Sequence, residues 1–218
     1  MVFTKRNILA IGAHADDIEI GCGGTVAMHV RKGDNVIMLI MGDPFYDYYD
    51  GRVLRSSKGG RGETECGAKV LGCKKLINLG FENKSIPYSA ESVEAINKVI
   101  DEYSIEMIYT HWYHDTHQDH MRTTQSAFSA GRYVSNILMY EPEYPAGRSY
   151  LGFRNQYYMD ITSTFEMKMD ALKCHESQVT KYGNDFLEAV EARARHRGYE
   201  IGSKYAECFE IVRLLGEV

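Results

Sequence analysis

The chain has 218 residues, of which 44% are hydrophobic and 25% are charged. This supplies enough apolar material for one sizeable core, and the length fits a single α/β domain over residues 1–218. The formal net charge of -5 leaves no basic footprint for phosphate backbones, which argues against nucleic acid as a partner. No stretch reaches the roughly 18 apolar residues of a membrane span, and the opening MVFTKRNILAIGAHADD has too short an apolar run for a signal peptide. We therefore expect a cytoplasmic protein without a membrane span.

The five cysteines are odd in number and scattered, and no two form a C-x-x-C pair. This pattern predicts neither a disulfide framework nor a cysteine-rich zinc site. We expect them to be buried thiols of a reducing compartment. They are Cys22, Cys66, Cys73, Cys174 and Cys208.

Apolar runs of strand length alternate with amphipathic stretches of helix length, which is typical of a mainly parallel sheet flanked by helices. The capping-box pair Ser163 and Glu166 indicates where the fifth helix begins. In chain order we expect strand 7–12, helix 24–32, strand 36–41, helix 62–71, strand 75–79, helix 90–103, strand 107–110, helix 119–134, strand 136–140, strand 156–161, helix 164–176 and helix 184–196.

Two longer segments, 43–60 and 141–155, interrupt this alternation and are rich in Tyr, Gly and Pro, so we expect loops there. In an open parallel sheet, the loops that leave the carboxyl ends of the strands form the ligand crevice. The segments that begin at His14, Asp43, His111 and Glu141 all leave such ends. They should converge on one site.

The first of these segments, His14-Ala15-Asp16-Asp17-Ile18-Glu19, follows the apolar run NILAIGA directly. An imidazole and a carboxylate spaced three apart on a turn can face one cation, and His with Asp suits zinc. Asp16 then lies near the metal but is free for another role. The alternative is that His14 and Asp17 only cap the helix that follows.

The segment HWYHDTHQDH holds half of the chain's eight histidines within ten positions. A loop that delivers a metal ligand and an acid/base pair explains them better than a helical stripe does. The alternative is a surface loop of solvated histidines, which suits His114 best. Together the two segments supply two His and one Asp, a ligand set that leaves metal positions open for water and substrate. The stretch Gly21-Cys22-Gly23-Gly24 lacks the spacing of a dinucleotide loop, so nucleotide binding is rejected.

AHADDIEIGCGG, followed about a hundred residues later by HQDH, resembles the LmbE-like, or PIG-L, family of zinc-dependent de-N-acetylases. Weaker matches are GRGETECGAKVLG, LGFEN, ALKCHESQ and YAECFEI. The family's usual prolines are replaced by Ala15 and Gln118, which should alter loop rigidity without loss of activity. The resemblance implies a Rossmann-like sheet, and a substrate in which an acetamido group sits on a hexosamine, as in N-acetylglucosamine. It assigns zinc to His14, Asp17 and His120.

The resemblance also implies that Asp16 is the general base and that His117 and Asp119 form an assisting pair. Asp16 would take a proton from water activated by zinc, while zinc and protonated His117 stabilise the oxyanion. Asp119 would orient His117 through a hydrogen bond, or cap the helix that follows, or do both.

Substrate contacts are expected from Arg61, which aligns loosely with a family arginine, and from the tyrosines Tyr46, Tyr48 and Tyr49, which can stack on a pyranose ring. The alternatives are a solvated first-turn charge for Arg61 and packing against their own loop for the tyrosines. His29 and His175 lie on predicted helices and are expected to be packed or exposed, not ligands. His196, in the run EARARHRG, is expected on a solvated or subunit-contacting face.

Two other functions are alternatives to deacetylation of a sugar. The first is hydrolysis of another small amide or ester, because a ligand set defines hydrolysis better than it defines the substrate. The second is a catalytically silent sugar-binding module, against which the placement of Asp16 beside an intact ligand set argues. The family resemblance leaves a homo-oligomer open.

Overall fold

The computed structural model describes residues 5–48, 50–143 and 147–216. Its central feature is a seven-stranded sheet of order β5-β2-β1-β6-β7-β9-β8, in which the strands from β5 to β7 are mutually parallel and β9 is antiparallel to both of its neighbours. The predicted mainly parallel sheet is confirmed. Its strands are β1 (Asn7–Gly12), β2 (Asn35–Gly42), β5 (Lys75–Phe81), β6 (Met107–Thr110), β7 (Asn136–Tyr140), β8 (Tyr157–Asp160) and β9 (Ala206–Arg213).

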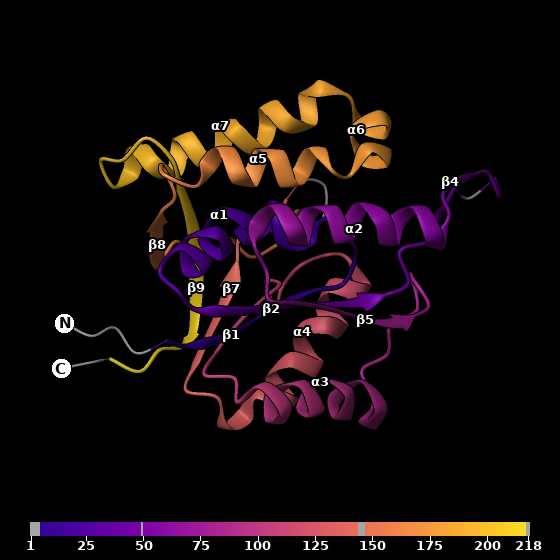
Figure 1. Cartoon of the computed structure of the whole chain (residues 1–218), viewed down its shortest axis with the longest axis horizontal. Coiled ribbons are helices and arrows are strands. Elements are labelled where there is room, and N and C mark those ends of the chain that lie inside the picture. Colours follow the sequence, from indigo (N-terminus) through magenta and orange to yellow (C-terminus); the bar gives the residue numbers. More distant parts are fainter. Residues whose placement is uncertain (1–4, 49, 144–146, 217–218) are drawn as a thin grey trace.

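Helices cover both faces of the sheet (Figure 1). One apolar cluster packs α1, α2 and α5 on one face, a second packs α3 and α4 on the opposite face, and a third joins α5 to α7 in an outer layer. Because β1 and β2 are covered on both sides, their residues are apolar without alternation. The helices are α1 (Asp17–Arg31), α2 (Ser57–Leu71), α3 (Ala90–Tyr103), α4 (Gln118–Ala130), α5 (Phe165–Lys173), α6 (Glu176–Tyr182) and α7 (Asn184–Glu200).

Strands β1 and β6 are hydrogen-bonded neighbours at the middle of the sheet, with Ala10 opposite Tyr109. β1 ends at Gly12 and β6 ends at Thr110, so the two histidine-containing segments leave the same edge side by side. The topology therefore brings the two predicted motifs together, although about a hundred residues separate them.

Helix α1 begins at Asp17, seven residues before the predicted start, and runs through the glycine stretch with a kink at Cys22. The reason is tertiary: the buried Glu207 carboxylate on β9 accepts hydrogen bonds from the N–H groups of Gly24 (2.9 Å) and Thr25 (2.7 Å), where the helix resumes. A Cβ on Gly21 would lie 2.3 Å from the ring of Tyr140. The glycines thus serve close packing of α1 on the sheet.

Other local predictions were wrong. The segment 43–60 contains a small hairpin, β3 (Tyr46–Asp47) and β4 (Val53–Arg55), and α2 already starts at Ser57. Strand β9 and helix α6 were not predicted. The expected capping box at Ser163 is absent from α5, whose N-cap is Thr164 and has no side-chain cap bond; a capping box is found instead at Ser89 of α3.

The cysteine prediction is also corrected, because Cys66 on α2 and Cys174 at the end of α5 form a disulfide across 108 positions of sequence. Cys22, Cys73 and Cys208 are free thiols. Burial raises the pKa of the Cys73 thiol to about 12 and that of Cys208 to about 12, so both stay protonated. Among the helices of the described residues, none has the length and apolar character needed to cross a bilayer.

Candidate metal centre

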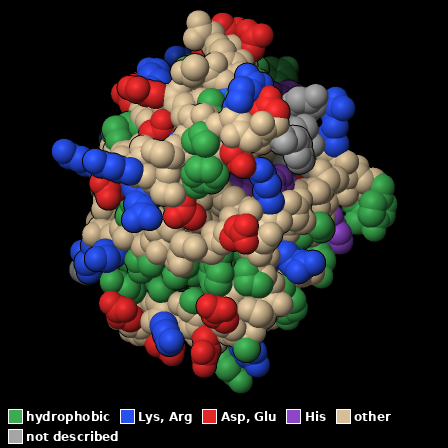
Figure 2. All heavy atoms as spheres, turned by 90° about the vertical axis from the view of Figure 1, so that its right-hand side faces the viewer, with side chains coloured by type: hydrophobic (Ala, Val, Ile, Leu, Met, Phe, Trp, Pro, Cys, Tyr) green, Lys and Arg blue, Asp and Glu red, His purple; other side chains and the backbone are tan. Residues whose placement is uncertain are grey.

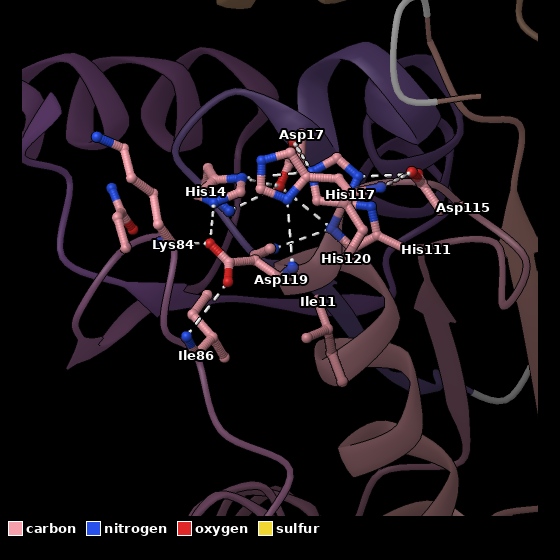
Figure 3. Close-up of polar contacts among 12 residues, drawn as sticks. Ile11, His14, Asp17, Lys84, Ile86, His111, Asp115, His117, Asp119 and His120 are labelled. Atoms are coloured by element: carbon pink, nitrogen blue, oxygen red, sulfur yellow. Dashed lines mark hydrogen bonds and ion pairs between the residues drawn. The ribbon is translucent and has the colours of Figure 1, made fainter. Parts of the chain in front are cut away.

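His14, Asp17 and His120 present one ligand atom each within 4.8 Å of one another at the carboxyl ends of β1 and β6. His14 Nδ1 lies 3.3 Å from His120 Nε2 and 3.5 Å from an Asp17 oxygen, and His120 Nε2 lies 3.5 Å from the other Asp17 oxygen. Two imidazole nitrogens and a carboxylate are the donors that zinc prefers. The donor set therefore fits a zinc ion, and Figure 3 shows His14, Asp17 and His120 gathered close together.

Each histidine of this set is held by a carboxylate on its other nitrogen. His14 Nε2 lies 3.0 Å from Asp119, and His120 Nδ1 lies 2.9 Å from Asp115. Such carboxylate–imidazole pairs fix the tautomer and the ring orientation of metal-binding histidines. Both carboxylates are buried, so the arrangement is preformed.

Charge pairing dominates the protonation of these groups in the metal-free chain. Burial alone would lower the pKa of His14, but hydrogen bonds to Asp119 and Asp17 outweigh it and raise the pKa to about 8. The same competition, with Asp17 and Asp115 as the partners, raises the pKa of His120 to about 10. Burial would raise the pKa of Asp17, yet the neighbouring His120 and His111 hold it well below its usual value. A site that attracts this much positive charge is suited to a cation.

Asp16 occupies the turn between β1 and α1 in an unusual backbone conformation, with φ at 106° and ψ at -26°. Conformations of this kind cost about 1–3 kcal/mol and persist only where the surrounding structure imposes them. Burial, followed by the charge of Asp17, raises the pKa of the Asp16 carboxyl to about 6. Its carboxylate makes no side-chain cap bond to α1.

His117 is the N-cap residue of α4, where its Nδ1 accepts a hydrogen bond of 3.2 Å from the backbone N–H of Asp119. Burial, with the charges of His120 and His14, lowers the pKa of His117 to about 4. In the metal-free chain this ring is therefore neutral near pH 7, and a protonated His117 in the reaction stays a prediction. In the neutral ring Nδ1 is an acceptor, so Nε2 carries the hydrogen.

The expected bond from the Asp119 carboxylate to His117 is replaced by another arrangement. The Asp119 side chain contacts His14, and it also accepts the backbone N–H groups of Lys84 at 2.7 Å and Ile86 at 3.2 Å. Asp119 thus links to His117 only through its own backbone N–H.

Two members of the cluster were not assigned a role from the sequence. His111 Nε2 accepts the N–H of Ala13 at 2.9 Å, and its ring stacks on His120 with centroids 3.9 Å apart. Asp115, besides holding His120, accepts the N–H of His117 at 2.8 Å. The signal for Asp115 was present, because it is a carboxylate inside a histidine-rich loop, but only the fold shows which histidine it faces.

The other histidines lie outside the cluster, as expected. His29 is buried between Asp34 (2.7 Å) and Tyr109 (2.9 Å). His175 is fully buried and lies 3.0 Å from the equally buried Glu19. The side chain of His196 is 66% exposed, whereas Arg193 and Arg197 in the same run pair with Glu143 and Glu141 after β7. Those arginines pair with the two glutamates just after β7; they are not merely solvated.

The predicted substrate residues lie around the hairpin β3–β4 rather than in the cluster. Tyr46 and Tyr48 contact each other edge to face, with centroids 5.9 Å apart, and Lys181 Nζ lies 2.9 Å from the Tyr46 hydroxyl. The Arg61 side chain is 62% exposed and pairs with Asp43 at 3.5 Å. Tyr49 lies outside the described residues. Figure 2 shows histidine side chains between basic and acidic ones on this face.

The sheet thus carries, at the carboxyl ends of its central strands, where open α/β sheets bind ligands, a His/Asp cluster that could hold a metal ion. The family described as PIG-L, GlcNAc-PI de-N-acetylase, matches residues 9–130. The chain belongs to this family, and it is accordingly an N-deacetylase, a hydrolase that cleaves an amide bond.

Individual relatives agree with the family. An uncharacterized deacetylase of Escherichia coli K12, YaiS, is 31% identical over 180 residues, which cover 79% of this chain and 92% of that protein. Diacetylchitobiose deacetylase of Thermococcus kodakarensis is 27% identical over 225 residues, covering 95% of this chain and 83% of the relative. The fold is similar to that of N,N'-diacetylchitobiose deacetylase from Pyrococcus horikoshii, with a TM-score of 0.77, 24% identity and coverage of 96% and 84%.

Proposed function

We propose that the protein is a zinc-dependent hydrolase that removes the acetyl group from an N-acetylated hexosamine, releasing acetate and a free amine. The observation that carries the proposal is the set formed by His14, Asp17 and His120, with a buried carboxylate behind each histidine. Relatives named as diacetylchitobiose deacetylases support the sugar substrate.

The residues around the three proposed ligands have separate roles in the reaction. A zinc ion held there would lower the pKa of water and polarise the amide carbonyl. Asp16, which holds no place in the ligand set, accepts the proton from the attacking water and returns it to the leaving amine. Neutral His117 donates its Nε2–H to the oxygen that becomes negatively charged. Asp119 and Asp115 keep the two ligand histidines oriented.

Substrate contact is proposed for the hairpin side chains Tyr46 and Tyr48 and for Arg61, which lie on the segments leaving β2. Both tyrosines are only partly buried, so part of each ring can contact a pyranose, while the Lys181–Tyr46 contact fixes one ring in place. Replacing both tyrosines by alanine should raise KM and leave zinc bound. Unchanged kinetics would make them scaffold residues.

The test combines metal analysis with a substrate panel. The purified protein is assayed for zinc content and for release of acetate and free amine from N-acetylglucosamine, diacetylchitobiose, simple acyl amides and esters. About one zinc per chain with turnover of the acetylated sugars alone supports the proposal. Turnover of simple amides or esters only would move the function to another small-molecule hydrolase. Sugar binding without turnover at full zinc loading would leave a binding module.

A cytoplasmic location remains a prediction, and the Cys66–Cys174 disulfide bears on it, because disulfides are rare in reducing compartments. Thiol counting on protein taken rapidly from cells tests it: five reactive thiols in denaturant, the number of cysteines, fit a reduced compartment, and three thiols contradict it.

A further inference from the structure

Lys84 lies in the loop between β5 and α3 and makes contacts through both its backbone N–H and its side-chain Nζ. Its backbone N–H donates to the buried Asp119 carboxylate at 2.7 Å, as Figure 3 shows, and that carboxylate holds His14. Its side-chain Nζ lies 2.7 Å from an Asp47 carboxylate oxygen and 3.3 Å from the Asp47 carbonyl oxygen. One residue thus connects the metal centre to the hairpin that carries Tyr46.

Further contacts of this loop also connect the hairpin to the metal centre. The side chain of Asn83 donates to the carbonyl of Phe45 at 2.7 Å, immediately before the hairpin. Lys84 Nζ also lies 5.8 Å from the centre of the Tyr46 ring. On the other side, the Gln118 side chain at the start of α4 donates to the Lys84 carbonyl at 3.5 Å. The loop therefore fits between the hairpin and the helix that carries Asp119 and His120.

The backbone of Lys84 is in the left-handed region, with φ at 69°. This region disfavours any residue with a Cβ and suits glycine. A lysine kept in such a conformation indicates a use for its side chain, since the backbone position alone would be better served by glycine.

We propose that Lys84 is a positioning residue that sets the substrate hairpin relative to the metal centre. This role rests on the proposed function, because it treats Tyr46 as a substrate contact. In this role Lys84 is assigned no direct contact with metal or substrate. It acts through Asp47, whose position determines where the Tyr46 ring is presented.

The size of the effect follows from the exposure of the pair. The side chains of Lys84 and Asp47 are 44% and 37% exposed, and ion pairs at such sites change an equilibrium by about two- to five-fold. Loss of the pair should therefore raise KM by about two- to five-fold and change kcat little. Because added salt screens exposed pairs, high salt should raise the KM of the native enzyme toward that of the variant.

Lys84→Gly provides the sharpest test, since it removes the tether and relieves the backbone at once. We expect a raised KM, unchanged zinc content, faster hydrogen exchange in residues 46–55, and a melting temperature that does not fall. A residue with only a structural role would instead lose stability. Lys84→Arg should keep the native KM. Asp47→Asn, which removes the charge but keeps an acceptor oxygen and the backbone carbonyl, should raise KM less than Lys84→Gly and should add nothing to it. The matched control is Lys98→Gly, at an exposed position on α3, which should lower stability without raising KM.

Hydrogen exchange separates this proposal from the deacetylase proposal. If no acetylated sugar is turned over, the proposed function fails, yet exchange in residues 46–55 still decides whether Lys84 holds the hairpin. Exchange in Lys84→Gly equal to that of the native chain overturns the proposal. Loss of zinc in Lys84→Gly also overturns it, because the backbone contact to Asp119 would then be the residue's main role.

Discussion

Replacing Asp119 by asparagine should weaken metal binding while leaving the chain folded. The native carboxylate is fully buried and accepts three hydrogen bonds: one oxygen faces His14 Nε2 at 3.0 Å and the N–H of Lys84 at 2.7 Å, and the other faces the N–H of Ile86 at 3.2 Å. An amide has only one oxygen. Whichever way it is turned, its amino group must face at least one donor.

The smaller penalty arises when the amide oxygen replaces the oxygen that faces His14 and Lys84. The Ile86 N–H then faces an NH₂ group, and one unsatisfied buried donor costs about 1–3 kcal/mol of unfolding free energy. His14 also loses its carboxylate partner, a change that typically lowers metal affinity about 10- to 100-fold, or about 1.4–2.7 kcal/mol.

The assay is competition for zinc with a chromogenic chelator, alongside urea unfolding of the metal-free chain. Asp101→Asn, at an exposed position on α3, is the matched control and should change neither quantity. A zinc Kd within two-fold of the native value would refute the reasoning. A normal Kd with a reduced kcat would return Asp119 to the role of a partner of His117.

Four further outcomes are expected. Asp16→Asn should keep zinc and lower kcat by about 10²- to 10⁴-fold; loss of zinc in step with activity would make Asp16 a ligand. His114→Ala should leave zinc content unchanged, and a drop would enlarge the ligand set. Cys66→Ser opens a link across 108 positions, so the unfolding free energy in urea should fall by up to about 4.7 kcal/mol, and equal stability would show that the bond is not formed in solution. His29→Gln should flatten the pH dependence of the unfolding free energy. Burial lowers the pKa of His29 in the folded chain, so the unfolded chain binds the proton at a higher pH. The stability that neutral His29 contributes is therefore lost as pH falls through about 6.5. An equally steep slope in the variant would rule out His29 as the cause.

Local patterns predicted the elements whose shape is determined by their own residues. Helix α3 matches its predicted span, and β1 and β7 match theirs, because their apolar spacing and bounding residues are sufficient signals. The pairing of the two histidine-containing segments also followed from sequence, since parallel strands deliver their carboxyl ends to one edge.

The remaining features depend on partners far along the chain. The start of α1 at Asp17 is supported at the kink by Glu207, and the disulfide joins Cys66 to Cys174; no local pattern carries either contact. The roles of the carboxylates depend on side-chain direction as well. Asp119 lies two residues from His117 in sequence, yet its carboxylate faces His14, across 105 positions.

The adjacency of β1 and β6 also orders events during synthesis of the chain. His14 and Asp17 emerge early from the ribosome, but His120 lies 106 positions after His14, and β6 can pair with β1 only once it has been made. A nascent chain that ends before α4 has two of the three proposed ligands, His14 and Asp17, and lacks His120. Any ion that requires all three side chains is therefore held only after the centre of the sheet is assembled, so metal uptake would report completion of that centre and not the folding of β1 and β2 alone.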